Sequence, residues 1–250
     1  MPIANVRAAL SAGAAPSFND LQVLSNPLGL WLMDETSGAE FVDSGSVGQN
    51  GDWSASYPPG LGTATVFGLP AAEFIRDGGG RFDYGTLPLT GLTGSMAGAS
   101  GVATWEWLYR QDNNAYAASY IWKHDTGTVA TFYIQNTGQI VAKMYDATNA
   151  AYHMDATTGT GEIVVGTDYH IVATYDLSAP RFEIWVNGVS VSVATTATAS
   201  HEVRTSTGQA SMGATTASAT NGQEGAMSSV ALYPAVLSDA TIADHYAALS

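Results

Sequence analysis

Residues 169–193 contain the pattern that most constrains the fold of this chain. Every second residue is apolar in the run RFEIWV and again in VSVSV, which is the period of a strand with one buried face. The pair Asn187-Gly188 between the runs tolerates the positive φ angles of a type I′ turn, so a hairpin is predicted. In that hairpin six side chains face one core: Phe182, Ile184, Val186, Val189, Val191 and Val193.

The residues before this hairpin add a third antiparallel strand, because Ile171, Ala173 and Tyr175 alternate with their neighbours. A sheet with one strongly apolar face must cover that face with another layer. Other alternating runs can supply the layer; they contain Trp105 and Trp107, Phe132 and Ile134, and residues 140–144. We therefore predict an all-β protein, a sandwich of two antiparallel sheets.

The two ends of the chain carry helical patterns. Ser17 and Asp20 match a capping box that opens a helix through Leu24, and residues 1–26 are predicted to form an N-terminal arm with short helices. This arm either docks on the main domain, residues 27–250, or inserts into a neighbouring subunit. At the other end Ser238 can cap a short helix with one apolar stripe, formed by Ile242, Tyr246 and Leu249.

Composition excludes several classes of partner. The chain has 8 basic and 22 acidic residues, a net charge of −14, so a phosphate-binding surface for nucleic acid is not expected. No run reaches the roughly 18 apolar residues of a membrane span, and membrane insertion is not expected. The absence of cysteine excludes disulfides and thiolate chemistry. The start MPIANVRAALSAG lacks the apolar stretch of a signal peptide.

Five segments carry a family resemblance, and the strand and Asn-Gly hairpin within residues 169–193 are one of them. Residues 20–51 combine a proline, an aromatic strand, the turn DETSG and the loop DSG; segments 72–85, 101–110 and 228–249 follow, the last with a strand and a helix. In this order they resemble laminin-G-like domains of the concanavalin-A-like jelly-roll superfamily. The resemblance implies a two-sheet jelly roll, and it places both glycan binding and glucan cleavage among the expected functions.

Catalytic residues are not predicted. Glycoside hydrolysis needs two carboxylates close together, and on one strand they would lie at positions i and i+2 or i+4. Glu106 meets Leu108 and Arg110 at those spacings, and Glu183 meets Trp185 and Asn187. A pair assembled from different strands stays open as the alternative. The histidines lack zinc-ligand spacing and are interpreted as structural: His124, His153, His170, His201 and His245.

Calcium is the one metal that the resemblance implies, since some laminin-G-like domains hold it. Asp43, in the DSG loop, is the candidate ligand. Against a metal site, Ser228 and Ser229 stand near the position where many relatives have an acidic residue.

Ligand binding is predicted in two polar segments rich in aromatic residues, 110–125 and 143–155. Sugars present an apolar ring face and a rim of hydroxyls, which suit aromatic rings beside amide and carboxylate groups. Trp122 is interpreted as core, with a ligand contact as the alternative. The candidate ligand-binding residues are Asn114, Tyr116, His124, Tyr145, Asn149 and Tyr152.

These patterns favour a non-enzymatic recognition or structural module. Laminin-G-like modules recur in phage tail and capsid-surface proteins, so we expect a virion surface protein, or another extracellular one, that binds host glycans and contacts neighbouring assembly subunits as an oligomer. The alternatives are an architectural decoration protein without a ligand and a glycan-cleaving hydrolase.

Overall fold

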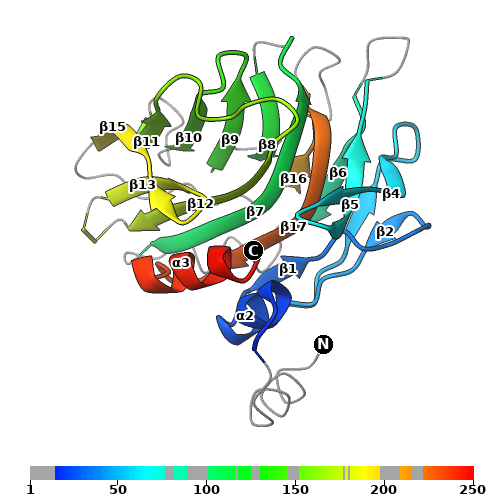
Figure 1. Cartoon of the computed structure of the whole chain (residues 1–250), viewed down its shortest axis with the longest axis horizontal. Helices are drawn as coiled ribbons and strands as arrows, with labels where there is room; N and C mark the ends of the chain where they lie inside the picture. The colour runs from blue at the N-terminus through cyan, green and yellow to red at the C-terminus, as the bar shows by residue number, and fades with distance from the viewer. Residues whose placement is uncertain are drawn as a thin grey trace.

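A computed structural model describes residues 15–76, 82–88, 101–115, 118–124, 130–145, 152–176, 178–179, 181–197, 209–214 and 222–250. Within these ranges the chain forms two antiparallel sheets that face each other, with two short helices on one side (Figure 1). The all-β sandwich predicted from the sequence is confirmed. Neither described helix is long and apolar enough to cross a membrane.

Sheet A is the eight-stranded layer, in the order β14-β13-β12-β7-β17-β5-β4 with β1 beside β17. Its long central strands are β7 and β17, which pair along most of their length. Its strands are β1 (Gly29–Trp31), β4 (Gly60–Val66), β5 (Leu69–Phe74), β7 (Val102–Asn113), β12 (Asp168–Asp176), β13 (Arg181–Val186), β14 (Val189–Ser190) and β17 (Glu224–Tyr233).

Sheet B is the nine-stranded layer, in the order β15-β11-β10-β9-β8-β16-β6-β3-β2. The strands of sheet B are β2 (Glu40–Phe41), β3 (Gly51–Trp53), β6 (Gly85–Pro88), β8 (Ala118–His124), β9 (Ala130–Gln135), β10 (Ile140–Tyr145), β11 (Tyr152–Thr158), β15 (Ser192–Ala197) and β16 (Gln209–Met212).

The hairpin that dominates the sequence is confirmed in its turn and in its first pair. Asn187 and Gly188 have φ angles of 51° and 76°, and Val186 lies opposite Val189. Val191 still donates its backbone N–H to the oxygen of Ile184 at 2.9 Å, but from Ser192 the chain continues as β15 of sheet B, beside β11. The prediction that Val189 belongs to the core is therefore wrong: its side chain is 62% exposed, because β14 is the outer strand of sheet A.

The main core lies between the sheets and contains the aromatic residues expected there. Trp105, Trp107, Trp122, Phe132 and Phe182 are all essentially inaccessible to solvent. Trp122 is thus confirmed as core. Half-buried Val191 packs against the edge of this core.

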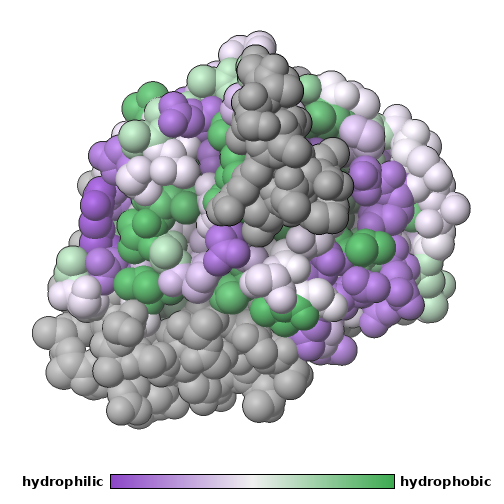
Figure 2. All heavy atoms as spheres, turned by 90° about the horizontal axis from the view of Figure 1, so that it is seen from below, coloured by the Kyte–Doolittle hydropathy of each residue, from purple (hydrophilic) through white to green (hydrophobic). Residues whose placement is uncertain are grey.

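The outer face of sheet A is also buried, which the alternation in β12 did not predict. Val172 and Trp185 point away from the main core and pack against α2 (Phe18–Leu24) and α3 (Asp239–Ala247). Both helices begin as predicted: Ser17 forms a complete capping box with Asp20, and Ser238 caps α3. On the side seen from below in Figure 2, hydrophobic and hydrophilic residues are interspersed over the described surface. The outer face of sheet B lies opposite the helices (Figure 1).

Candidate functional site

A continuous row of polar residues crosses the outer face of sheet B. Strand pairing places one residue from each of β2, β3, β6, β16, β8, β9, β10 and β11 directly beside the next. Because directly opposed residues point to the same face, their side chains form one line across the sheet. This polar row consists of Glu40, Asp52, Thr86, Ser211, Lys123, Thr131, Lys143 and Asp155.

The outward direction of the polar row follows from the alternation of inward and outward side chains along its strands. The sequence neighbours of the row, such as Phe41, Trp53, Phe132 and Met154, all lie in the core between the sheets. At β8 the alternation is interrupted by a bulge, since Ile121 and Trp122 are both buried there.

The bulge brings a tyrosine onto the same face as a lysine. Residues three apart on a regular strand point to opposite faces, but the Lys123 ammonium lies 5.2 Å from the ring centroid of Tyr120. Tyr120 pairs with Tyr133 of β9, and the two ring centroids are 5.5 Å apart. The Lys143 ammonium lies 5.7 Å from the Tyr133 ring. We call Tyr120 and Tyr133 the tyrosine pair; both rings are half-buried.

The centre of the polar row contains a hydroxyl with unused hydrogen-bonding capacity. Thr131 lies between Lys123 and Lys143, is 3% exposed, and its Oγ1 has no hydrogen-bond partner in the described part of the chain. The next hydroxyl along the row, that of Ser211, donates to the backbone oxygen of Lys123. Because both hydroxyls are buried from solvent, a ligand that lies over the lysines would not reach them.

The predicted binding residues are only partly placed. Asn114 is exposed just after β7, and Tyr145 is half-buried at the end of β10, opposite Tyr152 of β11 in the register. His124 and Tyr152 lie in β8 and β11, but their side chains are outside the described residues. Tyr116 and Asn149 also lie outside them.

The two segments chosen from the sequence contribute strands to sheet B, but the residues that these strands bring together on its outer face were not predicted. The two chosen segments become β8, β10 and β11, and β9 inserts Tyr133 and Thr131 between them. One signal was visible in the sequence: Lys123 and Lys143 are the only lysines of the chain, and each segment contains one.

A second polar cluster is buried under the helices on the outer face of sheet A. Glu106 of β7 is completely inaccessible, and its carboxylate is within hydrogen-bond distance of four side chains. An ionised carboxylate only accepts, so each partner donates. The donors are His170 Nε2 at 2.6 Å and His245 Nδ1 at 2.9 Å to Oε1, and Gln22 Nε2 and the Tyr233 hydroxyl to Oε2.

This cluster keeps the Glu106 carboxyl ionised and inaccessible to a substrate. Burial alone would raise the pKa of the Glu106 carboxyl, but the hydrogen bonds and charges of His170 and His245 lower that pKa well below its usual value. Burial and the Glu106 charge raise the pKa of Tyr233. Since Glu106, His170 and His245 are at most 1% exposed, no substrate reaches them. Both histidines hold structural positions that fasten α2 and α3 to sheet A.

Asp43, the candidate calcium ligand, holds its loop in place through hydrogen bonds to the backbone. Its side chain is 8% exposed, and its two carboxylate oxygens accept hydrogen bonds from the backbone N–H groups of Leu30, Gly45 and Gln49. The described residues contain no group of three or more acidic or histidine side chains arranged around a common metal position. This geometry favours loop organisation by Asp43 over ion binding.

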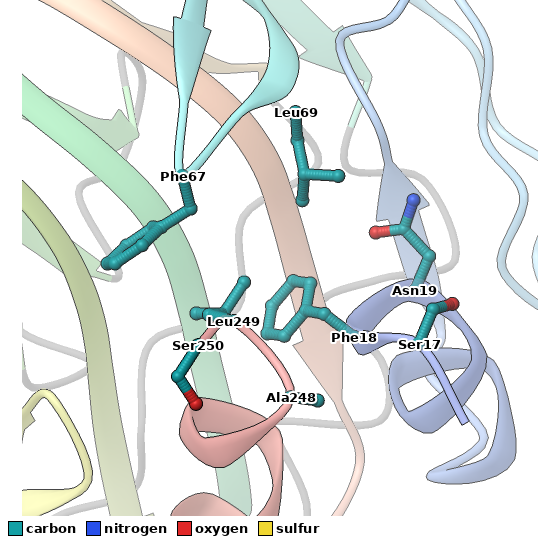
Figure 3. Close-up of a pocket in the computed structure, with 8 residues that line it drawn as sticks. All are labelled: Ser17, Phe18, Asn19, Phe67, Leu69, Ala248, Leu249 and Ser250. Atoms are coloured by element: carbon teal, nitrogen blue, oxygen red, sulfur yellow. The ribbon is translucent and has the colours of Figure 1, made fainter. Parts of the chain in front are cut away.

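A small pocket lies where α2, the end of α3 and the β4–β5 turn meet (Figure 3). Its volume is about 220 Å³, and apolar side chains dominate its lining, with Phe18 and Leu249 directed toward each other. Ligand pockets in proteins usually measure roughly 300–1,000 Å³ and combine apolar walls with converging polar groups. The pocket is therefore a weaker candidate than the polar row.

Comparison with known proteins establishes the family. The model of a laminin-G-type family, described as the concanavalin A-like lectin/glucanases superfamily, matches residues 79–243, well over half of the chain. The chain belongs to the concanavalin A-like lectin/glucanases superfamily. The family resemblance deduced from the sequence is confirmed. No curated protein matches this concanavalin A-like chain significantly.

Solved structures share the concanavalin A-like sandwich at low sequence identity. The binding domain of botulinum neurotoxin DC, in complex with SialylT, has a TM-score of 0.68 at 9% identity over 94% of this chain and 53% of that one. The serotype D binding domain has a TM-score of 0.64 at 9% identity, covering 89% and 51%. A Trypanosoma rangeli sialidase has a TM-score of 0.59 at 11% identity, covering 89% and 33%.

This chain thus spans between a third and about half of the length of those chains. The proteins with a similar fold include both toxin binding domains and a sialidase. At these identities the likeness concerns the fold alone.

Proposed function

We propose that this domain is a non-enzymatic module that recognises glycans through the outer face of sheet B. The observation that carries the proposal is the polar row beside the tyrosine pair. The rings of Tyr120 and Tyr133 offer apolar surface to one face of a sugar, while the charged side chains of the row offer hydrogen bonds to its rim. The linear shape of the row suits an extended oligosaccharide that crosses the strands.

The similar structures agree with this proposal. The botulinum neurotoxin DC binding domain was solved with SialylT, and a type C neurotoxin, also similar in fold, is described as depending on two ganglioside molecules. The glycan contact proposed here rests on the residues of sheet B and not on those names.

A glycan-cleaving hydrolase is the second candidate, because one acidic pair is assembled from different strands. Glu40 and Asp52 are directly opposed across β2 and β3, so their Cβ atoms are about 5 Å apart, and their carboxylates can adopt the separation of roughly 5 Å found in retaining glycosidases. Both side chains are exposed at the edge of sheet B, where water reaches them freely. Catalytic acids need an environment that separates their pKa values, which an open sheet edge does not provide.

For the biological setting we propose the surface of a virion, as a tail or capsid decoration protein, or another extracellular surface. The supporting observations are compositional: few charged residues, no cysteine and many small polar residues. In that setting neighbouring assembly subunits would contact the domain, and it would act as an oligomer.

A glycan array tests the proposed function. The wild-type domain should bind a defined subset of glycans, and Tyr120→Ala and Tyr133→Ala should each weaken that binding at least about fivefold, given roughly 1 kcal/mol for a lost aromatic contact. Tyr246→Leu is the matched control, because Tyr246 is a half-buried tyrosine on α3, on the opposite side of the sandwich. An array without any binding contradicts recognition. Release of reducing sugar that is lost in Glu40→Gln or Asp52→Asn would favour the hydrolase instead.

A further inference from the structure

A serine, a histidine and a glutamate are connected in series where α2 and α3 meet sheet A. The Oγ atom of Ser25 lies 3.1 Å from Nε2 of His245, and Nδ1 of His245 lies 2.9 Å from Oε1 of Glu106. Ser25 is the C-cap of α2 and is partly exposed, whereas His245 and Glu106 are buried behind it. This Ser–His–Glu series lies on sheet A, away from the proposed glycan-binding face of sheet B.

The ionised carboxylate of Glu106 determines which ring nitrogen of His245 carries the proton. A carboxylate only accepts hydrogen bonds, so Nδ1 of His245 donates to it. In the neutral imidazole Nε2 therefore has its lone pair available and accepts the hydrogen bond of the Ser25 hydroxyl. In this arrangement a histidine can remove the proton of a serine nucleophile. The imidazolium that forms would be paired with Glu106 in the last turn of α3, where the helix dipole favours a positive charge.

We propose that Ser25 is an activated nucleophile that takes up an acyl group from aryl esters or a phosphonyl group from phosphonyl fluorides. The Ser25 oxygen forms a bond to the carbonyl carbon or the phosphorus while its proton passes to Nε2 of His245. Because His245 is 1% exposed, it does not protonate the leaving group, which departs with the bonding electron pair as an aryl oxide or fluoride anion. The same burial keeps His245 from activating water, so the acyl or phosphonyl group stays on Ser25.

Labelling with an alkyl fluorophosphonate tests the proposal. Intact mass spectrometry should show the addition of a single phosphonyl group to the chain, and peptide mapping should place that group on Ser25. Ser17, at the other end of α2, is the internal control and should stay unlabelled, because its hydroxyl donates to the Asp20 carboxylate without an intervening imidazole. A p-nitrophenyl ester should release a single equivalent of p-nitrophenolate and then react no further.

Variants separate activation by His245 from exposure of the serine alone. Ser25→Ala should abolish the label, and His245→Gln should slow labelling at least roughly a hundredfold, the usual contribution of a general base.

Since His245→Gln also disturbs the anchoring of α3, the lack of cysteine in the chain provides a second test. The thiol introduced by Ser25→Cys should react with an aromatic disulfide at about pH 6.5 roughly tenfold faster than the thiol of Ser37→Cys, which replaces a fully exposed serine. An unlabelled Ser25 in the wild type overturns the proposal. A thiol in Ser25→Cys that reacts no faster than the one in Ser37→Cys overturns it as well.

Discussion

The Nε2 atom of His170 on β12 lies 2.6 Å from Oε1 of Glu106 on β7, and neither side chain is reached by solvent. This contact belongs to the cluster in which Gln22 of α2 and His245 of α3 meet the same carboxylate. A buried carboxylate is costly unless every oxygen is satisfied. Its full set of donors explains how two short helices are held on sheet A.

Replacing Glu106 by glutamine should strongly destabilise the domain. The amide keeps the shape of the side chain but presents a donor to groups that already donate, so the free energy of unfolding should fall by about 3 kcal/mol. The measurement is urea unfolding followed by tryptophan fluorescence. The matched control is Glu183→Gln, which breaks an ion pair at the surface and should cost no more than about 1 kcal/mol. Equal losses in the two variants would refute the anchoring role.

The contribution of Glu106 to stability should disappear in acid. The folded state lowers the pKa of Glu106 below its ordinary value of 4.5, so this stabilisation is complete above about pH 4.5 and is lost as the pH falls toward the folded pKa. The difference in unfolding free energy between wild type and Glu106→Gln should therefore be largest near pH 7 and shrink at about pH 3. A difference that is constant over this range would show that Glu106 does not titrate with folding.

Asp43 should stabilise its loop without calcium. Because its carboxylate accepts three backbone hydrogen bonds, Asp43→Ala should lower the free energy of unfolding by about 2 kcal/mol, whereas exposed Asp34→Ala should change it by at most about 0.5 kcal/mol. EDTA should leave the melting temperature of the wild type unchanged. A calcium-dependent rise in melting temperature that is absent in Asp43→Ala would establish a metal site instead.

Local patterns predicted the elements of this fold well, because alternation and capping are short-range properties. Three kinds of feature could be predicted in this way: the turn at Asn187-Gly188, the helix caps at Ser17 and Ser238, and the inward position of Trp105. Alternation specifies that a strand has two faces, but it does not specify which sheet the strand joins. For that reason the sequence did not predict that the chain passes from sheet A to sheet B after Val191.

Features assembled from distant strands were not predictable from spacing. Glu106 and His245 are 139 positions apart, and neither neighbourhood carries a motif. The polar row likewise exists only once the register of sheet B is known, since each of its strands contributes a single unremarkable polar residue. In the sequence, only the position of the two lysines indicated where the polar row lies.

The most direct test of glycan recognition by sheet B is a footprint of the bound glycan on the tyrosines. Hydroxyl-radical labelling with mass spectrometry would compare the oxidation of Tyr120, Tyr133 and Tyr246 with and without the tightest array ligand. Binding on the outer face of sheet B predicts protection of Tyr120 and Tyr133, with Tyr246 unchanged. Protection elsewhere, with Tyr120 and Tyr133 oxidised as before, would contradict glycan binding on the outer face of sheet B.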